Sequence, residues 1–219
     1  MRGQATATGI VVALLLTGCF GARPQLTRSF ALAPPVVTPV AAAFDAPSVR
    51  VRDLEPSPIV DRDMLVVRRS AVEYELRDEY HWALRPHRMV ASLLAHHLVD
   101  AGVVAAAPRT LGDGHPRFEL AGRLDTMEHD RSGGKSVVRL AVVLRLQRFE
   151  DGAIVWRYRF SAEQKTADVE GSDGAAAAVA GLSTLVARMT TQASAVLQAS
   201  GALKPAAKAM PDAAIDAQP

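Results

Sequence analysis

Alternation of hydrophobic and charged positions predicts several β-strands in the first half of the chain. Residues 49–54 (VRVRDL) and 72–76 (VEYEL) alternate apolar with charged side chains, as a strand with one buried face does. Two further β-like runs are 29–33 (SFALA) and 64–69 (MLVVRR). The stretch 34–47 is rich in Pro and Ala and predicts a loop between the first two strands.

The hydrophobic spacing changes to a helical one after this region. Pro86 suits the first turn of a helix, where its missing N–H is not needed, and Gly102 is a natural residue just past the end. The spacing therefore predicts a helix over about 86–101. Its expected apolar face consists of Val90, Leu93, Leu94, His97, Leu98 and Ala101.

Three longer alternating segments follow and predict an antiparallel meander with one apolar face. Glycine-containing turns at 131–135 (RSGGK) and 150–152 (EDG) connect them. The predicted apolar positions are Phe118, Leu120, Gly122 and Leu124 in the first strand, Val138, Leu140, Val142, Leu144 and Leu146 in the second, and Ile154, Trp156, Tyr158 and Phe160 in the third.

A second helix is predicted from a cap at Ser172 or Asp173 to about Ser200. Its expected buried stripe is Leu182, Val186, Met189, Ala193 and Val196. The order of elements predicts an α+β two-layer sandwich, in which both helices pack on one face of a mainly antiparallel sheet. We expect a single domain over 29–201, followed by a disordered Ala-, Pro-, Lys- and Asp-rich tail over 202–219.

Composition agrees with one ordinary domain and argues against nucleic-acid binding. The 219-residue chain is 49% hydrophobic, which is enough for a sizeable core. Its formal net charge of +2 is too balanced to indicate a nucleic-acid partner.

The amino terminus carries the strongest functional signal. Arg2 precedes a seven-residue apolar run, 10–16, which is too short to span a bilayer and is typical of a secretory signal peptide. Residues 16–19 (LTGC) resemble the bacterial lipobox, and Cys19 is the one cysteine in the chain. The resemblance implies cleavage after 1–18, diacylglycerol on the Cys19 sulfur and an N-acyl chain such as palmitate. The alternative is an ordinary signal peptide with an accidental cysteine.

The lipid anchor has consequences for location. Several acyl chains hold a protein stably at a membrane, whereas a single chain holds it only marginally. Residues 19–28 then form a short lipidated tether that keeps the domain close to the bilayer. Phe20, which stands where an aspartate would signal inner-membrane retention, favours the outer membrane on the periplasmic side.

The sequence contains no complete motif for catalysis or for cofactor binding. The GKS of residues 134–136 would need a glycine where His129 stands, and it joins two strands instead of opening a helix. His96 and His97 point about 100° apart on a helix and cannot easily share an ion. No GxSxG is present, so we predict a non-enzymatic protein without a metal or a cofactor beyond the lipid.

Arginine recurs on the polar side of the predicted sheet. These side chains either form its solvated face or meet an acidic protein surface or anionic lipid headgroups. They are Arg50, Arg52, Arg139, Arg145, Arg157 and Arg159.

Several phrases together resemble the ABC-type transport auxiliary lipoprotein family, which includes the paraquat-inducible C lipoproteins. They are the lipobox, FALAP (30–34), VRVRDL (49–54), the block 65–90, DAGVV (100–104), FELAGRL (118–124) and FEDGAIVWRYRF (149–160). The family's usual "WAEPP" is WALRP here, a departure at Leu84 and Arg85 that keeps the tryptophan and the helix-opening proline.

The resemblance implies a role in ABC-type intermembrane lipid transport. Family members are partners of a permease and an ATPase that work with MCE (mammalian-cell-entry) proteins, which form a periplasmic lipid tunnel. The lipoprotein is implied to be the outer-membrane end, and a homo-oligomer is implied because some members form rings. The alternative function is a lipoprotein chaperone or plug for an outer-membrane assembly, such as a lipopolysaccharide-delivering barrel.

We expect the partner-binding surface near residues 77–88, which the pattern places in a surface connection between a strand and the first helix. Aromatic residues and arginine are enriched at binding hot spots. The candidate contact residues are Arg77, Tyr80, Trp82, Arg85 and Arg88. The alternative is that Trp82 packs under the helix as a structural plug.

Overall fold

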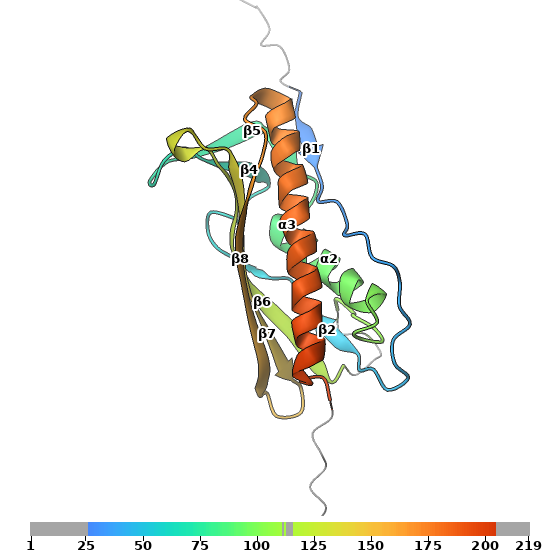
Figure 1. Ribbon diagram of the computed structural model, residues 1–219. Helices are drawn as coiled ribbons and strands as arrows, with labels where there is room; N and C mark the ends of the chain where they lie inside the picture. Colours follow the sequence, from blue (N-terminus) through green and yellow to red (C-terminus); the bar gives the residue numbers. More distant parts are fainter. Residues whose placement is uncertain (1–25, 111, 113–115, 205–219) are drawn as a thin grey trace, which may run out of the picture.

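The described part of the chain forms one mixed β-sheet with two helices on the same face (Figure 1). The computed structural model describes residues 26–110, 112 and 116–204. Helix α2 contacts β2 and β6, and α3 contacts β7 and β8, so the helices share the covering of one sheet face. This confirms the predicted α+β two-layer sandwich. The signal peptide, Cys19 and most of the predicted tether and tail lie outside the described residues.

The sheet contains eight strands. The short ones are β1 (Arg28–Phe30), β2 (Val49–Val51), β3 (Glu55–Pro56) and β4 (Met64–Arg68), followed by β5 (Tyr74–Trp82). The long ones are β6 (Phe118–Asp130), β7 (Val137–Arg148) and β8 (Ile154–Lys165). The helices are α2 (Pro86–Asp100), α3 (Gly171–Ser200) and a 3₁₀ turn, η1 (Ser132–Gly134).

Strand β6 organises the sheet. One of its edges pairs antiparallel with β7 along its whole length, and β7 pairs in turn with β8. The other edge is completed piecewise by β2, β3 and β4, all running parallel to β6. The strand order is β1-β5-β4-β6-β7-β8, so the sheet is mixed and its meander half is antiparallel.

The meander supplies most of the core, as predicted. All five predicted positions of β7 are buried, and so are Trp156 and Phe160 of β8. Ile154 is an exception, since its side chain is 42% exposed. A register shift places Ile154 opposite Gln147 while Trp156 lies opposite Leu146, and this irregularity takes Ile154 off the apolar face.

Helix α3 follows its predicted stripe except at its two ends. Leu182, Val186, Met189 and Ala193 are buried, but the last position is Leu197, because Val196 is 45% exposed. Leu197, four residues after Ala193, stays on the side of the helix that faces the sheet, whereas Val196, three residues after Ala193, turns away from it. The amino-terminal cap residue is Glu170, without a capping side-chain hydrogen bond, and not Ser172 or Asp173.

The short strands differ from their predicted bounds. Strand β2 ends at Val51, so the predicted strand 49–54 is shorter, and β1 begins one residue earlier than predicted. Val72 is 91% exposed in the turn between β4 and β5, whereas the prediction placed it in a strand. The β4–β5 pairing starts at Arg68 and Tyr74.

Gly122 leaves no room for a side chain between β6 and β7. A Cβ at this position would overlap the carbonyl oxygen of Val143 and lie 3.0 Å from the Leu144 side chain. We expect Gly122→Ala to lower the free energy of unfolding by about 1–3 kcal/mol, the usual cost of overpacking. Urea denaturation measures this change. Gly112→Ala is the control, because a Cβ there meets no atom of the described residues within 4 Å. An equal loss in both variants would contradict the assignment.

Candidate functional site

The predicted binding segment, 77–88, is not a surface loop in its first half. Strand β5 continues to Trp82, the connection comprises Ala83 to Arg85, and α2 begins at Pro86. The interpretation of 77–88 as a surface connection is therefore wrong up to Trp82. The five candidate residues divide into two aromatic residues of the core and three arginines in ion pairs.

Tyr80 and Trp82 hold strand β1 onto the sheet. Their side chains are only 9% and 6% exposed, and both belong to the hydrophobic core. The Tyr80 ring meets the Phe30 ring edge-on with centroids 6.1 Å apart. The Trp82 amide donates a hydrogen bond to the Asp63 carbonyl at 2.6 Å, and the Ala83 amide donates one to the Phe30 carbonyl at 2.7 Å. This placement agrees with the alternative in which Trp82 is a structural plug.

The exposed part of the segment lies where the chain enters α2. The Arg85 and Arg88 side chains are 53% and 55% exposed, and Leu84 between strand and helix is 46% exposed. Arg85 Nη1 lies 2.7 Å from Asp61 Oδ1, and Arg88 Nε lies 3.5 Å from Asp53 Oδ2. We call Leu84, Arg85 and Arg88 the α2-entry surface. Leu84 was missed as a site residue, although its departure from the family phrase was visible in the sequence.

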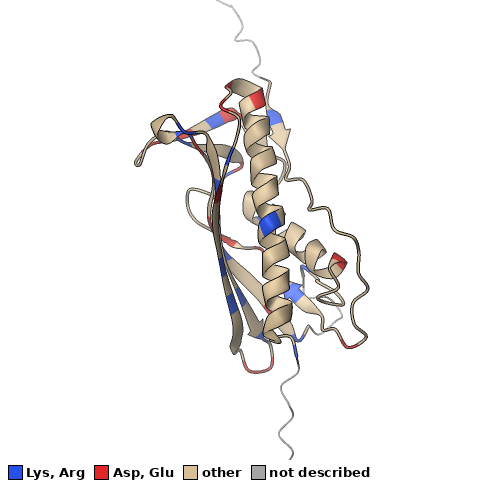
Figure 2. Ribbon diagram, viewed as in Figure 1, with Lys and Arg blue, Asp and Glu red and all other residues tan. Residues whose placement is uncertain are grey.

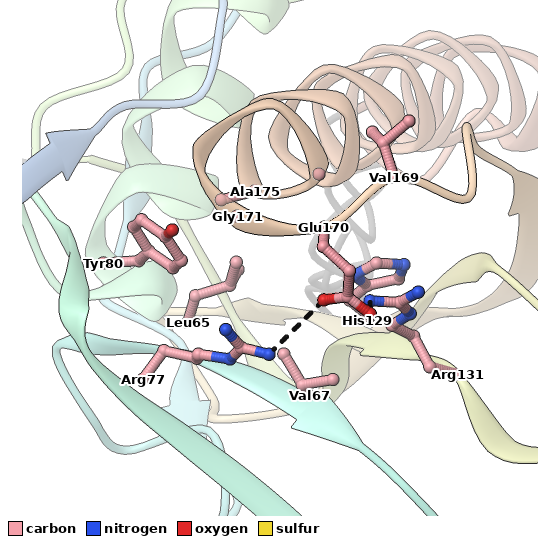
Figure 3. Close-up of a pocket in the computed structure, with 11 residues that line it drawn as sticks. Leu65, Val67, Arg77, Tyr80, His129, Arg131, Val169, Glu170, Gly171 and Ala175 are labelled. Atoms are coloured by element: carbon pink, nitrogen blue, oxygen red, sulfur yellow. Dashed lines mark ion pairs between the residues drawn. The ribbon is translucent and has the colours of Figure 1, made fainter.

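Arg77 lies apart from this surface, in a small pocket at the start of α3 (Figure 3). Its guanidinium group contacts Glu75 at 2.5 Å, Glu79 at 3.5 Å and Glu170 at 3.6 Å. Glu170 also lies 2.5 Å from Arg131, and Figure 3 shows its carboxylate between the two arginines. The pocket volume is about 20 Å³, which is room for about one water molecule. The cluster therefore ties the start of α3 to β5 and β6.

The arginines of this cluster stabilise the ionised form of a neighbouring carboxylate, that of Glu75. Partial burial alone would raise the pKa of the Glu75 carboxyl, but Arg69 and Arg77 outweigh it and hold this pKa below its usual value. Burial lowers the pKa of His129, which lines the same pocket, and the neighbouring Arg131 and Arg69 lower it further. His129 therefore stays neutral in the folded protein near neutral pH.

Three buried histidines predict a loss of stability in acid. Burial lowers the pKa of His87, His97 and His129, whereas the unfolded chain protonates histidine near pH 6.5. Below that pH the unfolded state binds more protons, so the free energy of unfolding falls as the pH drops from about 7 through the folded-state pKa values.

Urea titrations at a series of pH values measure this loss. His97→Gln is expected to reduce the pH dependence below pH 6.5, because it removes one of the three groups. His96→Gln, at the exposed neighbouring position, is the control and is expected to keep the slope of the parent chain. An unchanged slope in His97→Gln would show that this residue does not contribute.

Basic and acidic positions both occur along the strands of the sheet (Figure 2). Four of the six arginines predicted for its polar face form ion pairs. Arg50 and Arg52 share Glu119, and Arg139 contacts Asp130 at 2.6 Å. Arg145 lies 3.4 Å from Glu55. Arg157 and Arg159 are exposed on β8 and form no ion pair with any described residue.

The described part of the chain offers neither a metal-binding cluster nor a membrane-spanning helix. Within the described ranges, no group of three or more His, Cys, Asp or Glu residues could hold a metal ion. None of the described helices combines the length and apolarity that crossing a bilayer requires.

A protein-family model and several solved structures are similar to this chain. The family model described as "ABC-type transport auxiliary lipoprotein component" matches residues 30–194. No curated protein sequence matches the chain.

Solved structures share the fold at low sequence identity. A Xanthomonas campestris protein aligns with a TM-score of 0.69 at 18% identity, covering 80% of this chain and 97% of its own. A second, described as an uncharacterized protein, aligns with a TM-score of 0.56 at 15% identity, covering 80% and 98%. A hypothetical protein from Chlamydia trachomatis aligns with a TM-score of 0.50 at 8% identity, covering 73% and 99%.

Proposed function

The chain belongs to the family of ABC-type transport auxiliary lipoprotein components, and on that premise we propose that it docks a periplasmic lipid tunnel at the outer membrane. In this role it is a non-enzymatic, lipid-anchored component of an MCE/ABC-type intermembrane lipid transport system. The observation that carries the proposal is the family match over 30–194, which begins eleven residues after a lipobox-like cysteine.

The anchor and the fold support a tethering role. Cys19 stands seven residues before the first described residue, and a chain of that length spans at most about 25 Å when extended. Strand β1 follows almost at once and is held to the core by Tyr80 and Trp82. A lipid on Cys19 would therefore keep the sheet and its helices within a short distance of the membrane.

The α2-entry surface is the proposed contact for the MCE partner. It combines an exposed aliphatic side chain, Leu84, with two half-exposed arginines at the start of α2. This helix packs on β2 and β6 of the sheet. Arginine and apolar side chains together suit a protein contact, because they bury area and still offer charged hydrogen bonds. Tyr80 and Trp82 would support this surface from inside without touching the partner.

Reversing one charge tests the α2-entry surface. We expect Arg85→Glu to weaken binding to the MCE partner about tenfold or more while the melting temperature stays within about 2 °C, since exposed ion pairs contribute little stability. Lys135→Glu reverses an exposed charge in the turn between β6 and β7 and serves as the matched control. If both variants bind like the parent chain, the contact lies elsewhere.

Co-purification tests the function itself. The full chain, solubilised from native membranes in mild detergent, is expected to bring down an MCE protein together with its permease and ATPase. Recovery of an outer-membrane barrel in their place would favour the chaperone or plug function. Recovery of neither would overturn the transport role.

A further inference from the structure

Strand β8 is a long edge strand. It is last in the strand order, and no described strand pairs with its outer edge. It runs from Ile154 to Lys165, twice the length of an average strand of about six residues. Helix α3 covers its inner face, but the backbone N–H and C=O groups on the outer edge are left to solvent or to another chain.

Charges on the outer face of β8 are arranged in two halves. Arg157 and Arg159 lie in the first half without an ion-pair partner among the described residues. Glu163 and Lys165 lie in the second half. The Glu163 side chain is 64% exposed and has a single contact, to Arg139 at 3.4 Å. An antiparallel copy of the same strand would present these halves in reverse order, so positive positions could face negative ones.

We propose that β8 pairs antiparallel with β8 of a second copy of this chain, about a twofold axis at Phe160. In this register Arg157 faces Glu163 of the second copy, Arg159 faces Ser161, and Val155 faces Lys165. The twofold axis repeats each pair, so the interface contains two Arg–Glu pairs and no directly opposed like charges. Cross-strand pairs of opposite charge stabilise a sheet, and like pairs destabilise it.

Neighbouring registers are less favourable. Side chains alternate between the two faces of a strand, so only shifts by two residues keep the outer faces together. A shift in one direction places Arg159 opposite Arg159 of the second copy. A shift in the other direction places Arg157 opposite Lys165. The charges of β8 therefore select the register centred on Phe160.

Helix α3 can accommodate such a dimer. Antiparallel pairing makes one continuous sheet, and the two copies of α3 then lie side by side on the same face. Figure 2 shows that this helix is nearly free of charge, with Arg188 as its one basic residue. Its exposed positions are mostly small or uncharged, which lets two helices approach: Ala176, Ala180, Thr184, Thr191, Gln192, Ala195 and Ala199.

Two groups oppose association. The two copies of Arg159 lie diagonally opposite each other across the axis on the outer face, and Arg188 lies near the axis on the inner face. Its guanidinium carbon lies 5.5 Å from the centre of the Phe160 ring, so the two copies of Arg188 would approach each other at the twofold axis. Arg188→Gln is therefore expected to tighten the dimer severalfold. A weaker dimer in this variant would contradict the position of the axis.

A charge exchange tests the register. The full chain, purified in mild detergent, is expected to behave as a dimer when its protein mass is measured by light scattering over a concentration series. Arg157→Glu alone and Glu163→Arg alone are each expected to weaken the dimer about tenfold or more. The double variant Arg157→Glu/Glu163→Arg restores both pairs with the charges reversed and is expected to recover the parent dissociation constant.

The control for the charge exchange is Arg123→Glu, which reverses an exposed arginine on β6, away from the edge. Circular dichroism checks that each variant is folded. A parent chain that stays monomeric at all concentrations would overturn the proposal. So would a double variant no better than the single ones, because that result would leave the Arg157–Glu163 pairing without support.

Disulfide formation provides a second, independent measurement. Mixing Arg159→Cys with Ser161→Cys chains under mild oxidation is expected to give a cross-linked heterodimer, because these positions face each other across the interface. The parent chain, which contains Cys19, is the background control. Mixing Arg159→Cys with Lys135→Cys is the negative control. Equal cross-linking in the two mixtures would rule out the proposed pairing.

Discussion

Trp82→Ala is expected to lower the free energy of unfolding by about 3–5 kcal/mol, the usual cost of removing a buried tryptophan. The side chain is 6% exposed and belongs to the hydrophobic core, and Trp82 directly precedes the connection that leads into α2. For a domain of this size, the loss corresponds to a fall in melting temperature of about 6–20 °C. Thermal unfolding followed by circular dichroism measures it.

Two further variants separate the role of Trp82 from that of the exposed surface beside it. Trp82→Phe keeps most of the buried area and is expected to lose less than half as much stability. Leu84→Ala, two residues away and half exposed, is expected to leave the melting temperature nearly unchanged. An unaltered melting temperature in Trp82→Ala would mean that this tryptophan is not part of the core.

Cys19→Ala is expected to move the protein from the membrane fraction to the soluble fraction, or to leave it as an uncleaved precursor. Each buried methylene of an acyl chain contributes about 0.8 kcal/mol to membrane binding, so losing the lipidated residue removes the anchor altogether. Fractionation followed by detection with an antibody measures the distribution. The control is Ser29→Ala in β1, which changes a nearby side chain without removing the thiol. Unchanged membrane recovery of Cys19→Ala would exclude lipidation as the means of attachment.

The elements with strong local periodicity were predictable from the sequence. Helix α2 begins at Pro86 as predicted and ends within one residue of its predicted end. The proline marks its start, and Gly102 lies just past its end. The meander was predictable because each of its long strands repeats apolar residues at every second position. In both cases the pattern is complete within one segment, and distant parts of the chain are not needed to define it.

The extent of β5 was not predictable by the same reasoning. The apolar alternation of residues 72–76 stops at Leu76, and between Arg77 and His81 the pairing with β4 shifts register. The strand then continues because β1, some fifty residues earlier, pairs with Tyr80, His81 and Trp82. A pairing of that kind leaves no periodic trace in the local sequence. For this reason the local pattern did not show that Tyr80 and Trp82, two of the five candidate residues, are buried.

The ion pairs of the open face could not be predicted from the sequence either. Arg50 and Arg52 find Glu119 only because β2 pairs in register with β6 across almost seventy residues. Residue type predicted a polar face correctly, but the neutralisation of most of its arginines depends on strand register. The two arginines left without partners became visible only once the pairing was known.

The direction of α3 sets a length scale for the whole assembly. The chain enters at β1, beside Tyr80 and the start of α3, and its last described residues lie at the other end of that helix (Figure 1). A helix of 30 residues is about 45 Å long. If Cys19 carries a lipid, the carboxyl end of α3 lies about 45 Å from the β1 end, where the lipid tether joins the fold. A label or fusion placed after Ser200 would then report the height of the protein above the bilayer.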